Sequence, residues 1–303
     1  MPEPSAALPP LTLGVCSWSL QVTSIAQLVR LLGELGVGAT QIACGDPHHA
    51  RWEEGDDFPR AALDSGLLFS GAMLGFPGED YSTPQSIQRT GGFGDPATRA
   101  ERLELLRWGI DRTKALGLAD LTLHAGFLPE ADHADRPALL ATLREAGRMA
   151  GGEGVTLAFE TGQESALLLR MTLDELDSPD LMVNFDPANM LLYDMGDPLH
   201  AVEILADRIR SVHVKDARRP TIPGNWGEEV PLGRGEVDIP QFLRTLRAVG
   251  YAGALMVERE VGTASERLAD IRAGLDLIRE SLQAPVTAAD ARPGIPHADR
   301  PRT

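Results

Sequence analysis

Short apolar stretches alternate with longer amphipathic stretches through residues 11–282 of this chain. Eight of the short stretches have the composition of buried strands; they are 11–18, 38–43, 67–74, 120–126, 155–160, 181–186, 209–216 and 254–260. Between them, apolar residues recur at helical spacing, most clearly in 24–36, 95–117, 136–152, 197–209, 239–250 and 265–282. Strands separated by helices pair in parallel through right-handed crossovers. Eight such units without a linker predict a single α/β domain, a closed (β/α)8 barrel, in preference to a doubly wound open sheet.

The charge and the cysteine content exclude several classes of protein. The chain has 28 Lys and Arg against 44 Asp and Glu, a formal net charge of −16. Nucleic-acid affinity rests largely on clustered basic residues, so neither a nucleic acid nor an anionic membrane surface is expected as a partner. The two cysteines, Cys16 and Cys44, lie in apolar stretches, which excludes a disulfide framework.

The ends of the chain and its hydropathy indicate a cytoplasmic protein. No apolar run reaches the roughly 18 residues of a membrane-spanning helix, and residues 1–10 lack the basic and apolar regions of a signal peptide. We expect a flexible leader over 1–10, the barrel over 11–282 and a disordered tail rich in Ala, Pro and Asp over 283–303.

Ionisable residues stand at or near the ends of four consecutive predicted strands. They are Glu160 in 155–160, Asp186 in 181–186, His213 in 209–216 and Glu258 in 254–260. The C-terminal strand ends of such a barrel form its active-site face. Three carboxylates gathered there would repel one another and take up protons unless a cation neutralised them. An oxygen-rich ligand set with one imidazole suits Mn²⁺, Mg²⁺ or Co²⁺ better than Zn²⁺. The pattern predicts one divalent metal ion per chain; the alternative is four ordinary helix caps or solvated strand ends.

Five motifs resemble the sugar phosphate isomerase/epimerase family of xylose isomerase-like TIM barrels. They are LAFETG around Glu160, NFDPANM around Asp186, SVHVKDA around His213, PLGRGEVD at 231–238 and VERE around Glu258. The resemblance covers residues 11 to about 280, and the family includes ketose 3-epimerases, hydroxypyruvate isomerase, inosose dehydratase and, more distantly, endonuclease IV. It implies that Glu160, Asp186, His213 and Glu258 bind one catalytic divalent ion. It also implies that Glu160 and Glu258 stand on opposite faces of the substrate's C3, where one removes a proton and the other delivers one.

The chain departs from the family at two places. Many members carry D-x-x-H after the sixth strand, whereas this chain has Asn189 at the last of these positions. Asn189 can donate a hydrogen bond to substrate but cannot supply a second metal-binding nitrogen. The endonuclease branch also has a D-x-H pair after the seventh strand, and none occurs between Lys215 and Glu258. Together with the negative charge, this argues against DNA repair.

Further residues are expected at the substrate pocket. His124 ends the fourth strand, and the resemblance places it in the sugar pocket and Arg219 on a substrate hydroxyl, with Arg218 as the alternative. The list is completed by Trp226, in a Gly-rich loop resembling a lid; Trp18, as an apolar wall or as barrel packing; and Lys215, as a substrate contact or as an ion-pair partner of Asp216. Glu79 and one of His48 and His49 are weaker candidates for the pocket rim.

These features predict a metal-dependent isomerase or epimerase of a small ketose or ketose phosphate. The expected reaction is C3 epimerisation through a metal-stabilised enediolate, with a pair of glutamates moving the protons. A keto-sugar or keto-inositol dehydratase using the same metal site is the alternative within this chemistry. A noncatalytic sugar-binding barrel is the alternative of another class. The expected partner is a small sugar or sugar phosphate, and a homo-oligomer is left open.

Overall fold

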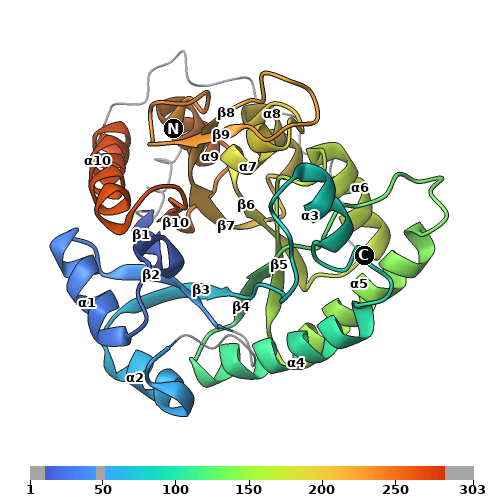
Figure 1. Cartoon of the computed structure of the whole chain (residues 1–303), viewed down its shortest axis with the longest axis horizontal. Helices are drawn as coiled ribbons and strands as arrows, with labels where there is room; N and C mark the ends of the chain where they lie inside the picture. Colours follow the sequence, from blue (N-terminus) through green and yellow to red (C-terminus); the bar gives the residue numbers. More distant parts are fainter. Residues whose placement is uncertain (1–10, 46–51, 284–303) are drawn as a thin grey trace, which may run out of the picture.

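The chain folds into a closed barrel of parallel strands surrounded by helices (Figure 1). The computed structural model describes residues 11–45 and 52–283. The barrel strands are β1 (Thr12–Cys16), β2 (Ala39–Ala43), β3 (Leu68–Met73), β4 (Asp120–Leu123), β5 (Thr156–Glu160), β6 (Leu181–Phe185), β7 (Ile209–Val214) and β10 (Ala254–Val257). They close in the order β1-β10-β7-β6-β5-β4-β3-β2, and each neighbouring pair is parallel. The predicted (β/α)8 TIM barrel is thus confirmed.

Each strand ends at or before the end of the stretch that predicted it. β4, for example, ends at Leu123 although the apolar stretch continues to 126, and β10 ends at Val257 although its stretch continues to 260. The residues beyond these strand ends leave the sheet and are free to line a cavity. The predicted leader, nearly all of the predicted tail, and His48 and His49 lie outside the described residues.

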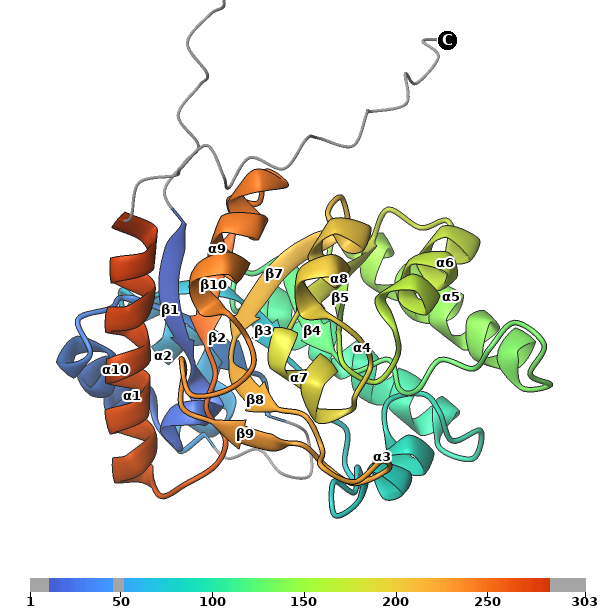
Figure 2. The ribbon, with the colours of Figure 1, turned by 90° about the horizontal axis from the view of Figure 1, so that it is seen from above.

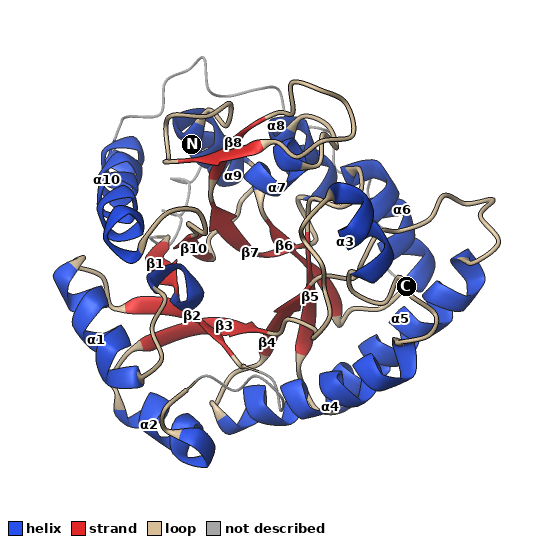
Figure 3. Cartoon of the chain, in the orientation of Figure 1, coloured by secondary structure: helices blue, strands red, loops and turns tan. Residues whose placement is uncertain are grey.

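Helices surround the barrel on its outer side (Figure 3). Within residues 11–45 and 52–283 they are α1 (Ile25–Glu34), α2 (Phe58–Asp64), α3 (Pro84–Thr90), α4 (Arg99–Ala115), α5 (Arg136–Gly152), α6 (Ala166–Leu176), α7 (Pro187–Leu192), α8 (Pro198–Leu205), α9 (Ile239–Ala248) and α10 (Ala264–Gln283). Several begin at a side-chain cap: Ser24 accepts from the main chain of α1, and Asp238 does so for α9. Their apolar faces pack on the strands, as where Phe185 of β6 stacks on Phe242 of α9. No helix of the described part is long and apolar enough to cross a membrane.

A small antiparallel hairpin adds to the C-terminal end of the barrel. It pairs β8 (Asp216–Arg218) with β9 (Glu228–Val230), and Figure 2 shows it at the same end of the barrel as α3. The Asp216 carboxylate accepts hydrogen bonds from the main-chain N–H groups of Ala217, Gly233, Gly235 and Val237. One buried side chain therefore organises the Gly-rich loop that the sequence suggested as a lid.

Candidate active site

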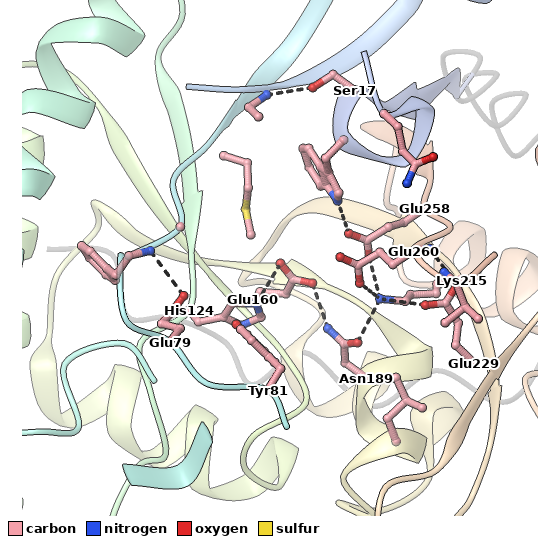
Figure 4. A pocket seen from close by; sticks show the side chains of 18 of the residues that line it. Ser17, Glu79, Tyr81, His124, Glu160, Asn189, Lys215, Glu229, Glu258 and Glu260 are labelled. Carbon is pink, nitrogen blue, oxygen red and sulfur yellow. Dashed lines mark hydrogen bonds and ion pairs between the residues drawn. The ribbon is translucent and has the colours of Figure 1, made fainter. Parts of the chain in front are cut away.

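A cavity of about 1110 Å³ opens at the C-terminal ends of the barrel strands. Its walls come from segments that follow the strands, including Trp18 after β1, Glu79 after β3, His124 after β4 and Glu258 after β10. Figure 4 shows the labelled polar side chains around this space, among them Glu160, Lys215 and Glu258. The cavity therefore lies on the face where a barrel of this type carries its chemistry.

Four side chains converge at the bottom of the cavity. Glu160 is the last residue of β5, Asp186 and Glu258 directly follow β6 and β10, and His213 lies within β7. One ligand atom from each lies within 4.8 Å of the others. All four residues are buried, with at most 4% of their surface exposed. The equivalent positions on consecutive strands thus bring together the residues that the sequence singled out for a metal.

Two carboxylate oxygens in this cluster have no hydrogen-bond partner. Asp186 Oδ1 caps α7 by accepting from the N–H groups of Ala188 and Asn189, which leaves Oδ2 buried and unpaired. Glu160 Oε2 is also buried and unpaired. Burial, together with the charges of Glu258 and Glu160, raises the pKa of Asp186 well above its ordinary value, against the opposing effect of Lys215. Unpaired carboxylate oxygens of this kind are costly, and a divalent cation fits both the donor set and its charge.

His213 is held between a hydrogen-bond acceptor and the carboxylates. Its Nε2 bonds the Oε1 of Gln41, whose own Nε2 donates to Thr122 Oγ1 at 2.9 Å. This places a proton on Nε2 and turns Nδ1 toward Glu160 Oε1, 3.2 Å away, and Glu258 Oε2, 3.4 Å away. Nδ1 is thereby the nitrogen directed at the candidate metal position.

Cys16 adjoins the same cluster from its place at the end of β1. Its sulfur, His213 and Glu258 also form a group with atoms close enough to hold an ion. Burial raises the pKa of the Cys16 thiol to about 12. Cys16 is fully buried and packs with Ala39 and Met256, as its place in an apolar stretch suggested.

Both carboxylate oxygens of Glu258 accept a hydrogen bond. Trp18 Nε1 donates to its Oε1 at 2.6 Å, and Lys215 Nζ donates to its Oε2 at 3.1 Å. Although burial works in the opposite direction, Lys215 and His213 hold the pKa of Glu258 well below its ordinary value. Trp18 and Lys215 both line the cavity. Both side chains therefore face the cavity and contact the buried cluster. The ion-pair partners of Lys215 are Glu258, Glu260, Glu229 and Asp186, whereas the sequence suggested Asp216.

His124 and Asn189 lie on either side of Glu160. His124 Nε2 is 3.8 Å from Glu160 Oε2, and its ring lines the cavity. Asn189 Nδ2 donates to Glu160 Oε1 at 2.9 Å, and Asn189 also lines the cavity, where the sequence predicted a substrate contact. The loop after β5 packs tightly here, because a Cβ on Gly162 would lie 2.4 Å from the Cβ of Asn189.

The two candidates from the loop after β7 are placed differently. Trp226 lines the cavity and packs edge-to-face on Tyr193. Arg219 is absent from the described cavity lining: its guanidinium donates to the carbonyl of Gly196 and pairs with Asp194 and Glu236. The neighbouring Arg218 pairs with Glu228 across the hairpin. The expected arginine contact with substrate is corrected accordingly: Arg218 is held by its partner across the β8–β9 hairpin, and Arg219, directly after β8, is held by Gly196, Asp194 and Glu236.

Several residues of the cavity had no clear signal in the sequence. Among the described residues they include Trp52, Tyr81, Tyr193, Glu229 and Glu260, and Gln41 lies behind them against His213. Glu79, suggested at the rim, does line the cavity. Of these residues, only Glu260 could have been suggested from the sequence, because it follows Glu258 by two residues.

Comparisons with known proteins agree with this architecture. Residues 24–281 match the family described as Xylose isomerase-like TIM barrel. L-ribulose-5-phosphate 3-epimerase UlaE of Escherichia coli K12 is 29% identical over 196 residues, which cover 62% of this chain and 66% of that protein. The chain thus spans just under two thirds of that relative.

Solved structures show the same fold. A Xylose isomerase domain protein from Planctomyces limnophilus superposes with a TM-score of 0.79 at 31% identity, covering 90% of this chain and 97% of that one. D-allulose 3-epimerase from Methylomonas sp. gives a TM-score of 0.65 at 22% identity, covering 92% and 100%, which supports the fold alone. By its barrel and its family match, the chain belongs to the xylose isomerase-like TIM barrel family.

Proposed function

We propose that this protein is a divalent-metal-dependent epimerase of a small ketose, acting at C3. One observation carries the proposal: Glu160 and Glu258 belong both to the four-residue cluster and to the cavity lining, whereas Asp186 and His213 belong to the cluster but not to the described lining. The first pair can reach a substrate, while the second pair lies beneath it. The UlaE relative, named as an L-ribulose-5-phosphate 3-epimerase, supports the same reaction class.

Glu160, Asp186, His213 and Glu258 would together hold the ion. A divalent cation bound there would polarise the ketone oxygen of a substrate and make the adjacent C–H bond more acidic. Asp186 and His213 are held by the α7 main chain and by Gln41, so they suit a purely structural role toward the ion. Mn²⁺, Mg²⁺ and Co²⁺ all suit this donor set.

The two glutamates would exchange protons with the substrate carbon. Lys215 Nζ, 3.1 Å from Glu258 Oε2, favours the ionised carboxylate, so Glu258 can act as a base at neutral pH. Glu160 extends from β5 across the cluster and has one buried oxygen without a partner. In epimerisation one glutamate removes the C3 proton and the other returns a proton to the opposite face. Trp18 and Asn189 orient the two carboxylates through their hydrogen bonds.

Solvent exchange tests the proposal directly. The purified chain, loaded with Mn²⁺, is incubated in D2O with a panel of ketoses, keto-inositols and their phosphates, and NMR follows the label. Deuterium at C3 is the expected result. Label at C1 or C2 would instead indicate 1,2-isomerisation, and loss of water would indicate a dehydratase. Binding without label or water loss across the panel would leave a noncatalytic sugar-binding barrel as the correct description.

Variants connect the exchange to the two glutamates. Glu160→Gln and Glu258→Gln should each lower the exchange rate by about 10²- to 10⁴-fold, the usual contribution of a positioned acid or base. Because each change also removes an anionic metal ligand, the Mn²⁺ content must be measured beside the rate, at saturating metal. Glu104→Gln, an exposed carboxylate on α4, is the matched control and should leave the rate unchanged.

A further inference from the structure

Carboxylates dominate the ionisable side chains of the cavity. Five glutamates line it: Glu79, Glu160, Glu229, Glu258 and Glu260. Within residues 11–45 and 52–283, Lys215 is the only lysine or arginine among the lining residues. A pocket that binds a phosphate ester normally offers arginines, lysines or free main-chain N–H groups to the anion. The described lining therefore offers few groups that could bind an anion.

The charge of Lys215 is already surrounded by carboxylates. Its Nζ lies 2.6 Å from Glu260 Oε2, 3.1 Å from Glu258 Oε2, 3.8 Å from Glu229 Oε2 and 3.9 Å from Asp186 Oδ2. Figure 4 shows the lysine between Glu258, Glu260 and Asn189. A phosphate approaching Lys215 would have to approach these four carboxylates as well.

Two pairs of main-chain N–H groups beside the cavity are likewise occupied by glutamates. Glu79 accepts from the N–H groups of Phe76 and Gly92. Glu229 Oε1 accepts from the N–H groups of Glu260 and Val261. Clusters of loop N–H groups are the places where phosphates commonly bind. Here carboxylates of the chain itself fill these two clusters.

Among the residues that the structure describes, the charge balance stays negative even when a metal ion is counted. The five lining glutamates and Asp186 give six carboxylates at or below the cavity. Opposing them are Lys215, Arg259, which pairs with Glu229 at 2.7 Å, Arg102, which packs on Phe76 beside Glu79, and the two charges of a divalent ion. The carboxylates exceed these positive charges by one. The remaining wall is rich in aromatic side chains, among them Trp18, Trp52 and Trp226, which suit the apolar faces of an uncharged sugar.

We propose that the substrate carries no phosphate or carboxylate group, and that the site takes an uncharged polyhydroxy ketone. This inference rests on the proposed epimerase function and narrows its substrate class. It separates this chain from its relative UlaE, whose name specifies a phosphorylated sugar. The physical reason is repulsion: like charges brought together in a largely desolvated pocket oppose binding, and a phosphate ester adds nearly two negative charges.

Matched pairs of substrates test the inference. The Mn²⁺-loaded full chain is assayed for C3 exchange in D2O with D-ribulose, L-ribulose and D-fructose, and with D-ribulose 5-phosphate, L-ribulose 5-phosphate and D-fructose 6-phosphate. We expect kcat/KM for the best free ketose to exceed that of its own phosphate by about fiftyfold or more at low ionic strength. A higher kcat/KM for the phosphate in the best pair would overturn the inference while leaving the epimerase function intact.

A charge change at the rim provides the second measurement. Glu260 is half-exposed and pairs with Lys215, so Glu260→Gln removes one negative charge from the cavity. We expect the ratio of phosphate to free-sugar kcat/KM to rise about fivefold or more. Glu228→Gln, the same change on the outward side of the β8–β9 hairpin, should leave the ratio within about twofold. An unchanged ratio in Glu260→Gln would contradict the electrostatic argument.

Failure of the proposed function is visible separately. If none of the six sugars exchanges its C3 proton, the epimerase proposal fails for these sugars. Calorimetric titration of the same ketose and phosphate pairs then decides whether the site prefers the free sugar or its phosphate. Tighter binding of the free ketoses would support an uncharged ligand for a binding barrel. Tighter binding of the phosphates would overturn the inference in that case too.

Discussion

Single residues at the site differ mainly in whether their polar atoms have partners. One carboxylate oxygen of Asp186 caps α7 and the other has no hydrogen-bond partner, whereas each carboxylate oxygen of Glu258 accepts a hydrogen bond. Gln41 also provides a partner: its side-chain oxygen bonds His213 Nε2 and so decides that Nδ1 faces the carboxylates. The ligands are thus oriented by neighbours that would not themselves touch a metal.

Replacing Gln41 should weaken metal binding. Gln41→Leu keeps the volume but removes the acceptor for His213 Nε2, so the ring loses its fixed tautomer and orientation. We expect the affinity for Mn²⁺ to fall about 10- to 100-fold, as measured by competition with a chromophoric chelator. Gln41→Glu keeps an acceptor at the same place and should retain most of the affinity. Equal Mn²⁺ affinity in Gln41→Leu and the wild type would show that Gln41 does not orient the ligand.

The raised pKa of Glu164, a residue outside the four-residue cluster, predicts that the stability of the protein depends on pH. Burial raises its pKa from an ordinary 4.5 to about 8. The folded state therefore keeps a proton that the unfolded chain releases. The stabilising contribution is complete below about pH 4.5 and is lost as the pH rises toward 8.

The variant Glu164→Gln removes this titration. Its free energy of unfolding in urea should be close to that of the wild type at pH 5 and about 1–3 kcal/mol higher at pH 8.5. Glu104→Gln, at an exposed position, serves as the control and should show no such trend. A difference between Glu164→Gln and wild type that is constant with pH would contradict the assignment.

At the scale of elements, the β8–β9 hairpin is the addition that shapes the mouth of this barrel. It turns Arg218 and Arg219 toward partners outside the cavity and brings Trp226 and Glu229 to the cavity wall. Asp216 connects the hairpin to the loop that precedes α9, since its two oxygens accept from four main-chain N–H groups. The order of this region therefore depends on one carboxylate.

Asp216→Asn should loosen that loop. An amide presents one acceptor oxygen and one NH2 group, so two of the four N–H donors would face another donor. Leaving buried donors unpaired costs about 1–3 kcal/mol each. Hydrogen exchange should therefore become at least about tenfold faster at one pair of amides, either Gly233 and Gly235 or Ala217 and Val237. Asp238→Asn, a change at the α9 cap where Asn also caps well, is the control. Unchanged exchange at all four amides would contradict this role.

For the whole molecule, the buried cluster connects metal binding to stability. Without a cation the fold keeps Asp186 and Glu160 close together with unpaired buried oxygens. A ligand that binds only the folded state adds about 2.7 kcal/mol at 100 times its Kd. We therefore expect Mn²⁺ to raise the Tm by about 4 °C or more and EDTA to reverse the rise.

The control separates this effect from general ion binding by an acidic protein. Asp186→Asn caps α7 in the same way but removes one charge from the cluster, so its Tm should respond much less to Mn²⁺. An equal rise in both proteins would mean that the ion acts at the surface, where the formal net charge of −16 also attracts cations.

The sequence by itself determined the barrel and the four residues of the cluster. Both follow from local repeats: apolar stretches specify strands, helical spacing specifies the longer helices, and the ends of consecutive parallel strands meet at one face. Helices α2, α3 and α7 were not predicted, because six or seven residues are too few to display a helical repeat. The longer α6 was also missed, because the apolar residues Leu167 and Met171 on its exposed face obscure the repeat. Glu160, Asp186, His213 and Glu258 were found because each stands at or near the end of a strand.

Only the tertiary structure decided what those residues touch. Gln41 meets His213 across 172 positions of sequence, and Trp18 meets Glu258 across 240. It also placed Lys215 among carboxylates and turned Arg219 away from the cavity. Side-chain direction depends on packing between segments remote in the chain, and a local pattern carries no information about such contacts. The uncharged character proposed for the substrate follows from that arrangement, because the electrostatic energy of a bound group depends on its distance in space from each charge.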